Sequence, residues 1–129
     1  MRYLGIDYGD VRIGVALSDA EGNIAFPQKT ILNNKSAIIS LAKRAKQEGV
    51  ATIVIGLPIS FGGNETDQTK KVRAFAKMLA QKIAIPIEFE NEILTTRMAR
   101  DAGAKKKTID ASAAAIILQA YLDKQSPNS

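Results

Sequence analysis

The chain contains neither cysteine nor histidine among its 129 residues. These absences exclude disulfides, thiol nucleophiles, the usual zinc sites and every catalytic triad that depends on histidine. Any catalysis must therefore use carboxylates, hydroxyls or basic side chains, or a metal ion held by oxygen ligands. Mg²⁺ and Mn²⁺ are the hard cations that suit oxygen ligands.

Aromatic residues are also scarce, at 5% of the chain with no tryptophan. Only Tyr8 and Phe61 are predicted to lie in loops, so strong binding of single strands by base stacking is not favoured. No apolar run approaches the roughly 18 residues that cross a bilayer, and the first residues enter a strand pattern and not a signal peptide. These features predict a cytoplasmic protein with no membrane partner.

Positive charge, in contrast, is in excess: the formal net charge is +5 and the pI is about 9.6. This excess favours a polyanionic partner, although many basic proteins are simply soluble. The length, with a hydrophobic fraction of 46%, predicts a single domain over residues 1–123. A polar tail is expected over residues 124–129.

The hydrophobic pattern predicts the order β-β-β-α-β-α-β-α. Strands are expected at 3–7, 12–18, 28–32, 50–55 and 87–90, and the helices carry apolar stripes that include Leu41, Val72, Phe75, Leu79, Ala114, Ile117, Leu118 and Tyr121. A short helix over 95–102 and a basic loop over 103–108 precede the last helix, which is expected to open at Asp110. This order predicts an α/β fold with a five-stranded mixed sheet, three antiparallel strands followed by parallel ones, and helices on both faces.

Three acids are predicted to stand at element boundaries: Asp7 ends the first strand, Glu92 lies just past the last strand, and Asp110 opens the last helix. Cleavage of phosphodiesters by divalent metals needs several carboxylates that converge from separate segments. Each acid also has a simpler explanation: Asp7 as a turn former before Gly9, Glu92 as a solvent-facing acid, and Asp110 as a helix N-cap. The residues by themselves leave these alternatives open.

Several motifs together resemble the YqgF/RuvX family, and they occur in its order at Leu4–Asp19, Ile55–Pro58, Gly62–Gly63, Glu92–Thr96 and Asp110–Leu118. The family consists of bacterial proteins similar to Holliday junction resolvases, also described as pre-16S rRNA nucleases. The resemblance implies an RNase H-like fold and a Mg²⁺- or Mn²⁺-dependent nuclease that processes the 5′ end of pre-16S rRNA. It implies that Asp7, Glu92 and Asp110 are the catalytic residues and the metal ligands.

Basic residues close to these acids are the candidate contacts to substrate phosphates. They are Arg12, which matches the Arg-Ile-Gly-Val-Ala motif of the family, and Arg97, Arg100, Lys105, Lys106 and Lys107. A solvated loop explains the three lysines equally well. The expected partner is nucleic acid, with pre-16S rRNA first and branched DNA second, and the expected state is a monomer or weak homodimer.

The chain departs from the family pattern at three positions. Asn91 and Ile93 stand where the family often has aspartate and arginine, and Val11 stands where a basic residue is common. These departures motivate the alternative of a weakly active or inactive basic RNA-binding factor in ribosome biogenesis. A phosphotransferase of the actin and sugar-kinase group is disfavoured, because that fold needs two domains and the chain lacks a G-x-x-x-x-G-K-[ST] loop.

Overall fold

The computed structural model describes the backbone of residues 1–93 and 106–125, and the side chains of residues 1–92 and 111–125. Within these residues the chain forms five strands and three helices in the predicted order. They are β1 (Arg2–Tyr8), β2 (Arg12–Ser18), β3 (Ala25–Leu32), α1 (Ala37–Gln47), β4 (Val50–Ile59), α2 (Asp67–Ala80), β5 (Ile87–Ile93) and α4 (Lys106–Gln125).

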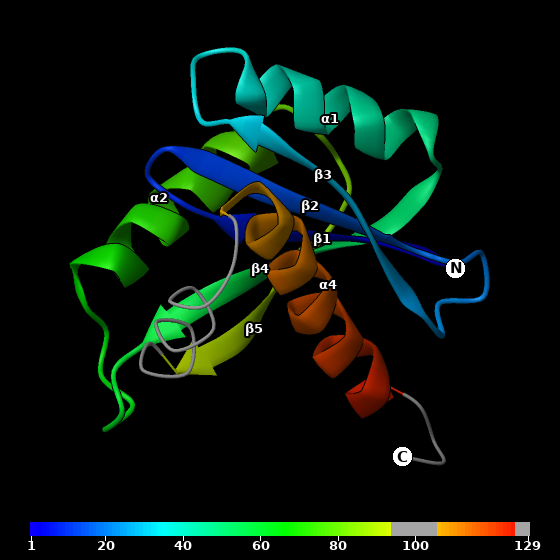
Figure 1. Ribbon diagram of the computed structural model, residues 1–129. Helices are drawn as coiled ribbons and strands as arrows, with labels where there is room; N and C mark the ends of the chain where they lie inside the picture. The colour runs from blue at the N-terminus through cyan, green and yellow to red at the C-terminus, as the bar shows by residue number, and fades with distance from the viewer. Residues whose placement is uncertain (94–105, 126–129) are drawn as a thin grey trace.

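The strands form one mixed sheet with the spatial order β3-β2-β1-β4-β5. β1 pairs antiparallel with β2, and β2 with β3, whereas β1 and β4, and β4 and β5, are parallel. The carboxyl ends of β1, β4 and β5 therefore meet at one edge of the sheet, on the left in Figure 1. β1 is the central strand, so a side chain at its carboxyl end lies in the middle of that edge.

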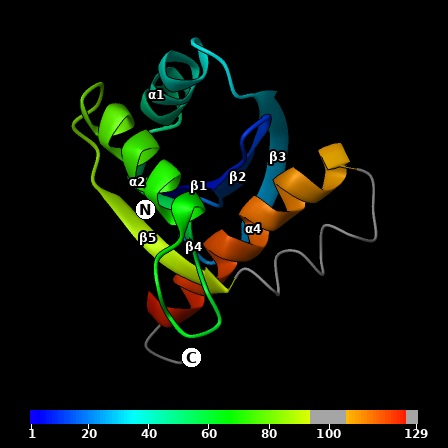
Figure 2. The same cartoon turned by 90° about the vertical axis from the view of Figure 1, so that its left-hand side faces the viewer.

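Helices cover both faces of the sheet, as predicted. Figure 2 shows α1 and α2 on one side and α4 on the other. One core cluster lies under α1 and α2 and includes Leu4, Ile6 and Ile55. A second cluster lies under α4 and includes Val54 and Leu118. Burial on both faces explains why the central strands are apolar nearly throughout.

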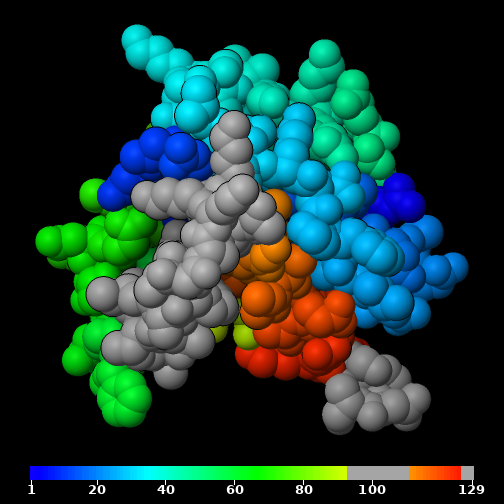
Figure 3. Space-filling view, in the orientation of Figure 1, coloured from blue at the N-terminus to red at the C-terminus, as the bar shows by residue number. Residues whose placement is uncertain are grey.

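α4 lies obliquely across its face of the sheet (Figure 1), and in the space-filling view its surface adjoins that of β3 (Figure 3). The carboxamide of Gln119 joins the two elements: its Oε1 accepts a hydrogen bond from Ala25 N at 2.9 Å, and its Nε2 donates to Asn23 O at 2.9 Å. The predicted inner stripe of this helix is confirmed, because Ala114, Leu118 and Tyr121 are buried. None of the described helices is both long and apolar enough to cross a membrane.

The start of α2 is joined to β4 through Thr69, which is fully buried. Its hydroxyl donates to the carbonyl oxygen of Pro58 and accepts a hydrogen bond from Thr66 N at 2.9 Å. Thr66 caps the helix in return by accepting from Thr69 N. One buried side chain thus satisfies groups of the strand and of the helix terminus.

Replacing Thr69 with valine is expected to lower the free energy of unfolding by about 1–3 kcal/mol, because the shape is kept while two hydrogen-bonding groups lose their partner. Urea unfolding followed by circular dichroism measures the change. Thr69→Ser keeps the hydroxyl and serves as the control. Equal stability of the valine variant and the wild type would show that the hydroxyl contributes nothing net.

Two strands extend further than the sequence pattern predicts. β4 continues past Ile55 to Ile59, and β5 continues past Glu90 to Ile93, because the two pair with each other over that length, as in Pro58 with Glu92. The last pair between β1 and β4 is Ile6 with Ile55. Beyond it β4 has a free side, and a proline is tolerated on an unpaired strand side. Glu92 therefore lies inside a strand, and its predicted place past the strand is wrong.

The remaining differences concern element ends. β3 begins at Ala25 and includes Pro27, which is tolerated because β3 is an edge strand. α4 begins at Lys106 and ends at Gln125, so it opens before Asp110 and extends into the predicted tail. The helix predicted over 95–102 lies outside the described residues.

Candidate metal and nucleic-acid site

Asp7 lies near the carboxyl end of the central strand, where it pairs with Gly14 of β2. Its neighbour Ile6 belongs to the core under α1 and α2, so the alternation of the strand directs Asp7 to the α4 face. The side chain is only 3% exposed. Asp7 is thus a buried strand residue, and its interpretation as a turn former is wrong.

The turn that follows Asp7 requires glycine because of a close approach. A Cβ at Gly9 would lie 2.5 Å from the carbonyl oxygen of Arg12. Gly9 itself does not have positive φ, which among the described glycines occurs at Gly22, Gly49 and Gly63. Asn33 Nδ2 donates to the Gly9 carbonyl at 2.8 Å and thereby holds the hairpin turn.

Glu92 is also buried, at 8% exposure. Alternation along β5 places it on the same face as Glu88 and Glu90, and both of these contact α4. Tyr121 donates its hydroxyl hydrogen to Glu88, and Lys124 Nζ lies 2.6 Å from Glu90 Oε2. The acids of β5 therefore point under α4, and the solvent-facing interpretation of Glu92 is wrong.

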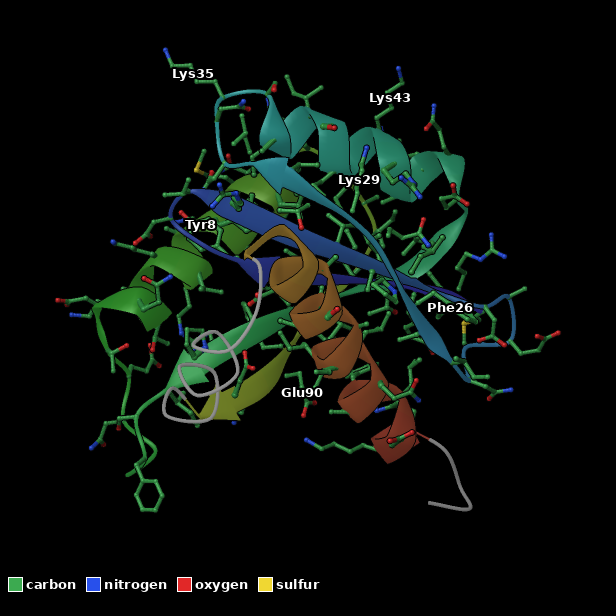
Figure 4. The ribbon with its side chains drawn as sticks, in the orientation of Figure 1. Tyr8, Phe26, Lys29, Lys35, Lys43 and Glu90 are labelled. Atoms are coloured by element: carbon green, nitrogen blue, oxygen red, sulfur yellow. The ribbon has the colours of Figure 1, made fainter. Side chains whose placement is uncertain are left out.

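The first two acids of that row serve to hold α4 in place. Burial, with the hydrogen bond to Glu88, raises the pKa of the Tyr121 hydroxyl above its usual value. The hydroxyl is a donor at neutral pH, and the raised pKa keeps it protonated in more alkaline solution as well. Glu90 is only 7% exposed and Lys124 neutralises its charge; Figure 4 shows Glu90 beside the C-terminal half of α4. Glu92, nearest the carboxyl end, is the remaining acid of the row.

Asp7 and Glu92 lie on the same face, two strands apart. Ile6 pairs with Ile55 and Gly56 with Glu90, so Asp7 is level with Glu90 and Glu92 lies further toward the carboxyl edge. Two strand spacings and an offset of two residues separate their backbones by about 12 Å. Gly56, on the strand between them, contributes no side chain, and the Ile117 side chain of α4 packs against it. Both carboxylates lie on the α4 face, near the edge where the parallel strands end.

The third predicted acid, Asp110, belongs to α4, and its side chain is not among those described. The backbone of α4 shows where the helical turn that contains position 110 lies. The carbonyl oxygen of Ala114 and the side chain of Leu118 lie against Gly5 of β1, and position 110 is one turn before Ala114, toward the carboxyl end of β1. Because the helix begins at Lys106, the N-cap explanation of Asp110 is wrong. Among the described side chains, no three acids form a group able to hold a metal ion.

The basic candidates are only partly described. Arg12 is the first residue of β2, and its alternation with Ile13, which belongs to the opposite core, places it on the face of Asp7. Lys106 and Lys107 lie in the first turn of α4 and not in a loop, which corrects the 106–108 part of the predicted loop; its part over 103–105 lies outside the described residues. Arg97, Arg100 and Lys105 lie outside the described residues.

The donor set suits a hard cation. The two buried groups are carboxylates, and the chain offers no imidazole or thiolate to favour zinc. A site built on Asp7 and Glu92 therefore fits Mg²⁺ or Mn²⁺, and the turn of α4 that contains position 110 lies at the same edge.

Comparisons with solved structures identify the fold. The fold matches Thermus thermophilus RuvC in complex with a Holliday junction substrate with a TM-score of 0.60 and 11% identity, covering 97% of this chain and 95% of that chain. It matches the fowlpox virus Holliday junction resolvase with a TM-score of 0.55 and 13% identity, covering 96% and 99%. The fold is therefore RNase H-like, as predicted.

Sequence comparisons show the family. A Rickettsia felis protein named "Putative pre-16S rRNA nuclease" is 42% identical over 93% of this chain and 84% of its own length. A Chloroflexus aurantiacus protein of the same name is 38% identical over 97% and 88%. The RuvX family model, described as Holliday junction resolvase, matches residues 1–124. The chain therefore belongs to the RuvX family.

Proposed function

We propose that this protein is a Mg²⁺- or Mn²⁺-dependent nuclease that hydrolyses phosphodiester bonds at the 5′ end of pre-16S rRNA. The observation that carries the proposal is the burial of Asp7 and Glu92 on one face, at the edge where β1, β4 and β5 end. Membership in the RuvX family supports the chemistry. The printed names of the relatives support the substrate, which would place the protein in the cytoplasm.

In this proposal Asp7, Glu92 and Asp110 hold the metal ion. When bound, Mg²⁺ or Mn²⁺ supplies the positive charge that activates water and stabilises the departing oxygen. The central strand orients the Asp7 carboxylate, because Asp7 pairs with Gly14 of β2 and its neighbour Ile6 pairs with Ile55 of β4. Burial also keeps bulk water from competing for the carboxylates.

The basic residues hold the substrate backbone beside the acids. Arg12 lies on the face of Asp7 and carries a fixed positive charge for a flanking phosphate. Lys106 and Lys107 occupy the first turn of α4, where the partial positive charge of the helix terminus adds to theirs. Arg97, Arg100 and Lys105 extend the same set along the chain.

The position of Asn91 favours the enzyme over the alternative of an inactive RNA-binding factor. Asn91 is exposed and follows Phe89, which packs on the core under α1 and α2. Alternation therefore places Asn91 on the opposite face from Glu92. An aspartate at position 91 would not join Asp7 and Glu92, so its absence removes no ligand from their face.

Cleavage and binding measured on one preparation test the proposal. A labelled RNA that spans the 5′ end of 16S rRNA should be cut in Mg²⁺ or Mn²⁺, remain intact in EDTA, and be cut again when the metal is restored. A branched DNA serves as the second substrate, and fluorescence anisotropy reports binding. RNA binding that falls with salt, without cleavage in either metal, would instead identify a binding factor.

A further inference from the structure

A pocket opens at the same carboxyl edge of the sheet as the candidate metal site, but on the face covered by α1 and α2. Its volume is about 340 Å³, and it lies between the end of β1, the loop before α1 and one side of α2. In Figure 4 Tyr8 lies by the first hairpin and Lys35 extends from the loop before α1 at the same end of the molecule. The pocket thus adjoins the strand that carries Asp7.

The walls of the pocket are apolar and partly aromatic. The ring of Tyr8 packs on the ring of Phe75, with centroids 4.8 Å apart and planes tilted by 47°. Ile38 and Met78 complete the walls, and Met78 is 56% exposed. Aromatic and thioether groups favour a flat, polarisable ligand over a compact anion.

Two amides lie at the rim of the pocket and are already oriented. Asn33 donates Nδ2 to the Gly9 carbonyl at 2.8 Å, and Asn34 Oδ1 accepts from the Ser36 hydroxyl at 2.8 Å. Among the described residues nothing bonds to Asn33 Oδ1 or Asn34 Nδ2. The rim therefore presents one acceptor and one donor, the two functions by which proteins bond to the edges of unpaired bases.

The remaining lining residues carry positive charge. Lys35 and Lys71 lie at the mouth of the pocket, and both are exposed. Lys71 pairs with Asp10 at 3.4 Å, a surface pair that costs little to exchange for another anion. Apolar walls, two amides and two ammonium groups together match the base, the base edge and the phosphates of a nucleotide.

We propose that this pocket binds an unpaired nucleobase of the nucleic-acid substrate, with Lys35 and Lys71 on the phosphates that flank it. The inference rests on the proposed nuclease function. Tyr8 directly follows Asp7, and its side chain extends from the opposite face of β1. A nucleic-acid strand that passes over the hairpin can therefore reach both Asp7 and the pocket. The substrate is then one with an unpaired segment beside the cleaved bond, since a fully paired duplex has no base to place in the pocket.

The binding step is tested on the full chain without divalent metal. Titration of the ¹⁵N-labelled protein with adenosine or uridine monophosphate should shift the amide signals of Asn33, Asn34 and Ala74 in a saturable manner. Ribose 5-phosphate and inorganic phosphate are the comparison ligands, and they should shift these signals far less. Equal shifts with either comparison ligand would overturn the proposal, because the lysines would then bind only phosphate.

Matched variants locate the binding. Ala74 lines the pocket on α2, so Ala74→Phe should fill it and weaken nucleotide binding at least about tenfold, the loss expected when a base loses its stacking contacts. Ala80→Phe, at an exposed position of the same helix, should leave the affinity unchanged. Lys71→Ala should weaken binding more than Lys70→Ala, whose side chain does not line the pocket. Unchanged affinity of Ala74→Phe would overturn the proposal.

The same titration separates this inference from the nuclease assignment. Asp7→Asn should still bind the nucleotide, because Asp7 faces the other side of the sheet. Nucleotide binding in a protein that cuts no RNA would leave the pocket established and overturn the nuclease. Cleavage that is equally fast for a fully paired duplex and for an RNA with an unpaired segment would overturn the role of the pocket.

Discussion

Replacement of Asp7 by asparagine is expected to reduce metal-dependent cleavage of pre-16S rRNA by about 10²–10³-fold. Asparagine has nearly the same size and shape, so the buried position in β1 stays filled. The negative charge proposed to hold the cation is lost, and no other carboxylate lies on the α4 face of β1. The measurement is the initial rate of cleavage at saturating Mg²⁺.

The control for this variant is Asp67→Asn, which makes the same chemical change at an exposed position in the first turn of α2. It is expected to retain wild-type activity. A second readout does not depend on catalysis: Mn²⁺ should raise the melting temperature of the wild type and of Asp67→Asn, but not that of Asp7→Asn. Full activity of Asp7→Asn would show that Asp7 is not a metal ligand.

Replacement of Gly5 by alanine is expected to lower the free energy of unfolding by about 1–3 kcal/mol, with a further loss of cleavage. A Cβ at this position would lie 2.8 Å from Leu118 Cβ and 3.0 Å from the carbonyl oxygen of Ala114. Neither atom can rotate away, so α4 must shift away from β1. The shift would also displace the turn of Asp110, which explains an effect on activity beyond that on stability.

Gly56→Ala is the matched control for Gly5→Ala. Its Cβ would lie 2.5 Å from Ile117 Cδ1, which is the far end of a flexible side chain and can change rotamer. The expected loss of stability is smaller, below about 1 kcal/mol. Urea unfolding of both variants, with cleavage rates at a temperature where both are folded, makes the comparison. Equal losses of stability in the two variants would show that the close approach to Gly5 does not determine the position of α4.

The sequence by itself determined the element order and the faces of the helices. Each helix carries an apolar stripe at the helical period. Leu41 of α1, Val72 of α2 and Leu118 of α4 belong to these stripes and are buried as the pattern predicts. The short turn between β1 and β2 requires an antiparallel hairpin, and the later helical crossovers require parallel strands. These features are local, because each depends on residues within one segment or one connection. They were therefore sufficient to predict a mixed sheet with helices on both faces.

The resemblance to the family, and not the spacing of the acids, selected Asp7 and Glu92 from the acids of the chain. The residues alone left each with a simpler explanation. The structure removes those explanations, because both side chains are buried on one face, at 3% and 8% exposure. The role of the Asp110 side chain as a metal ligand remains a prediction.

Only the tertiary structure decided what depends on contacts between distant segments. The pairing of β4 with β5 places Glu92 inside a strand and Asn91 on the other face. The packing of Ala114 and Leu118 on Gly5 directs the start of α4 toward Asp7. The pocket beside Tyr8 is formed by three segments that are far apart in the chain. Pairing partners and close approach are set by the whole sheet, and hydrophobic periodicity within one segment carries no information about them.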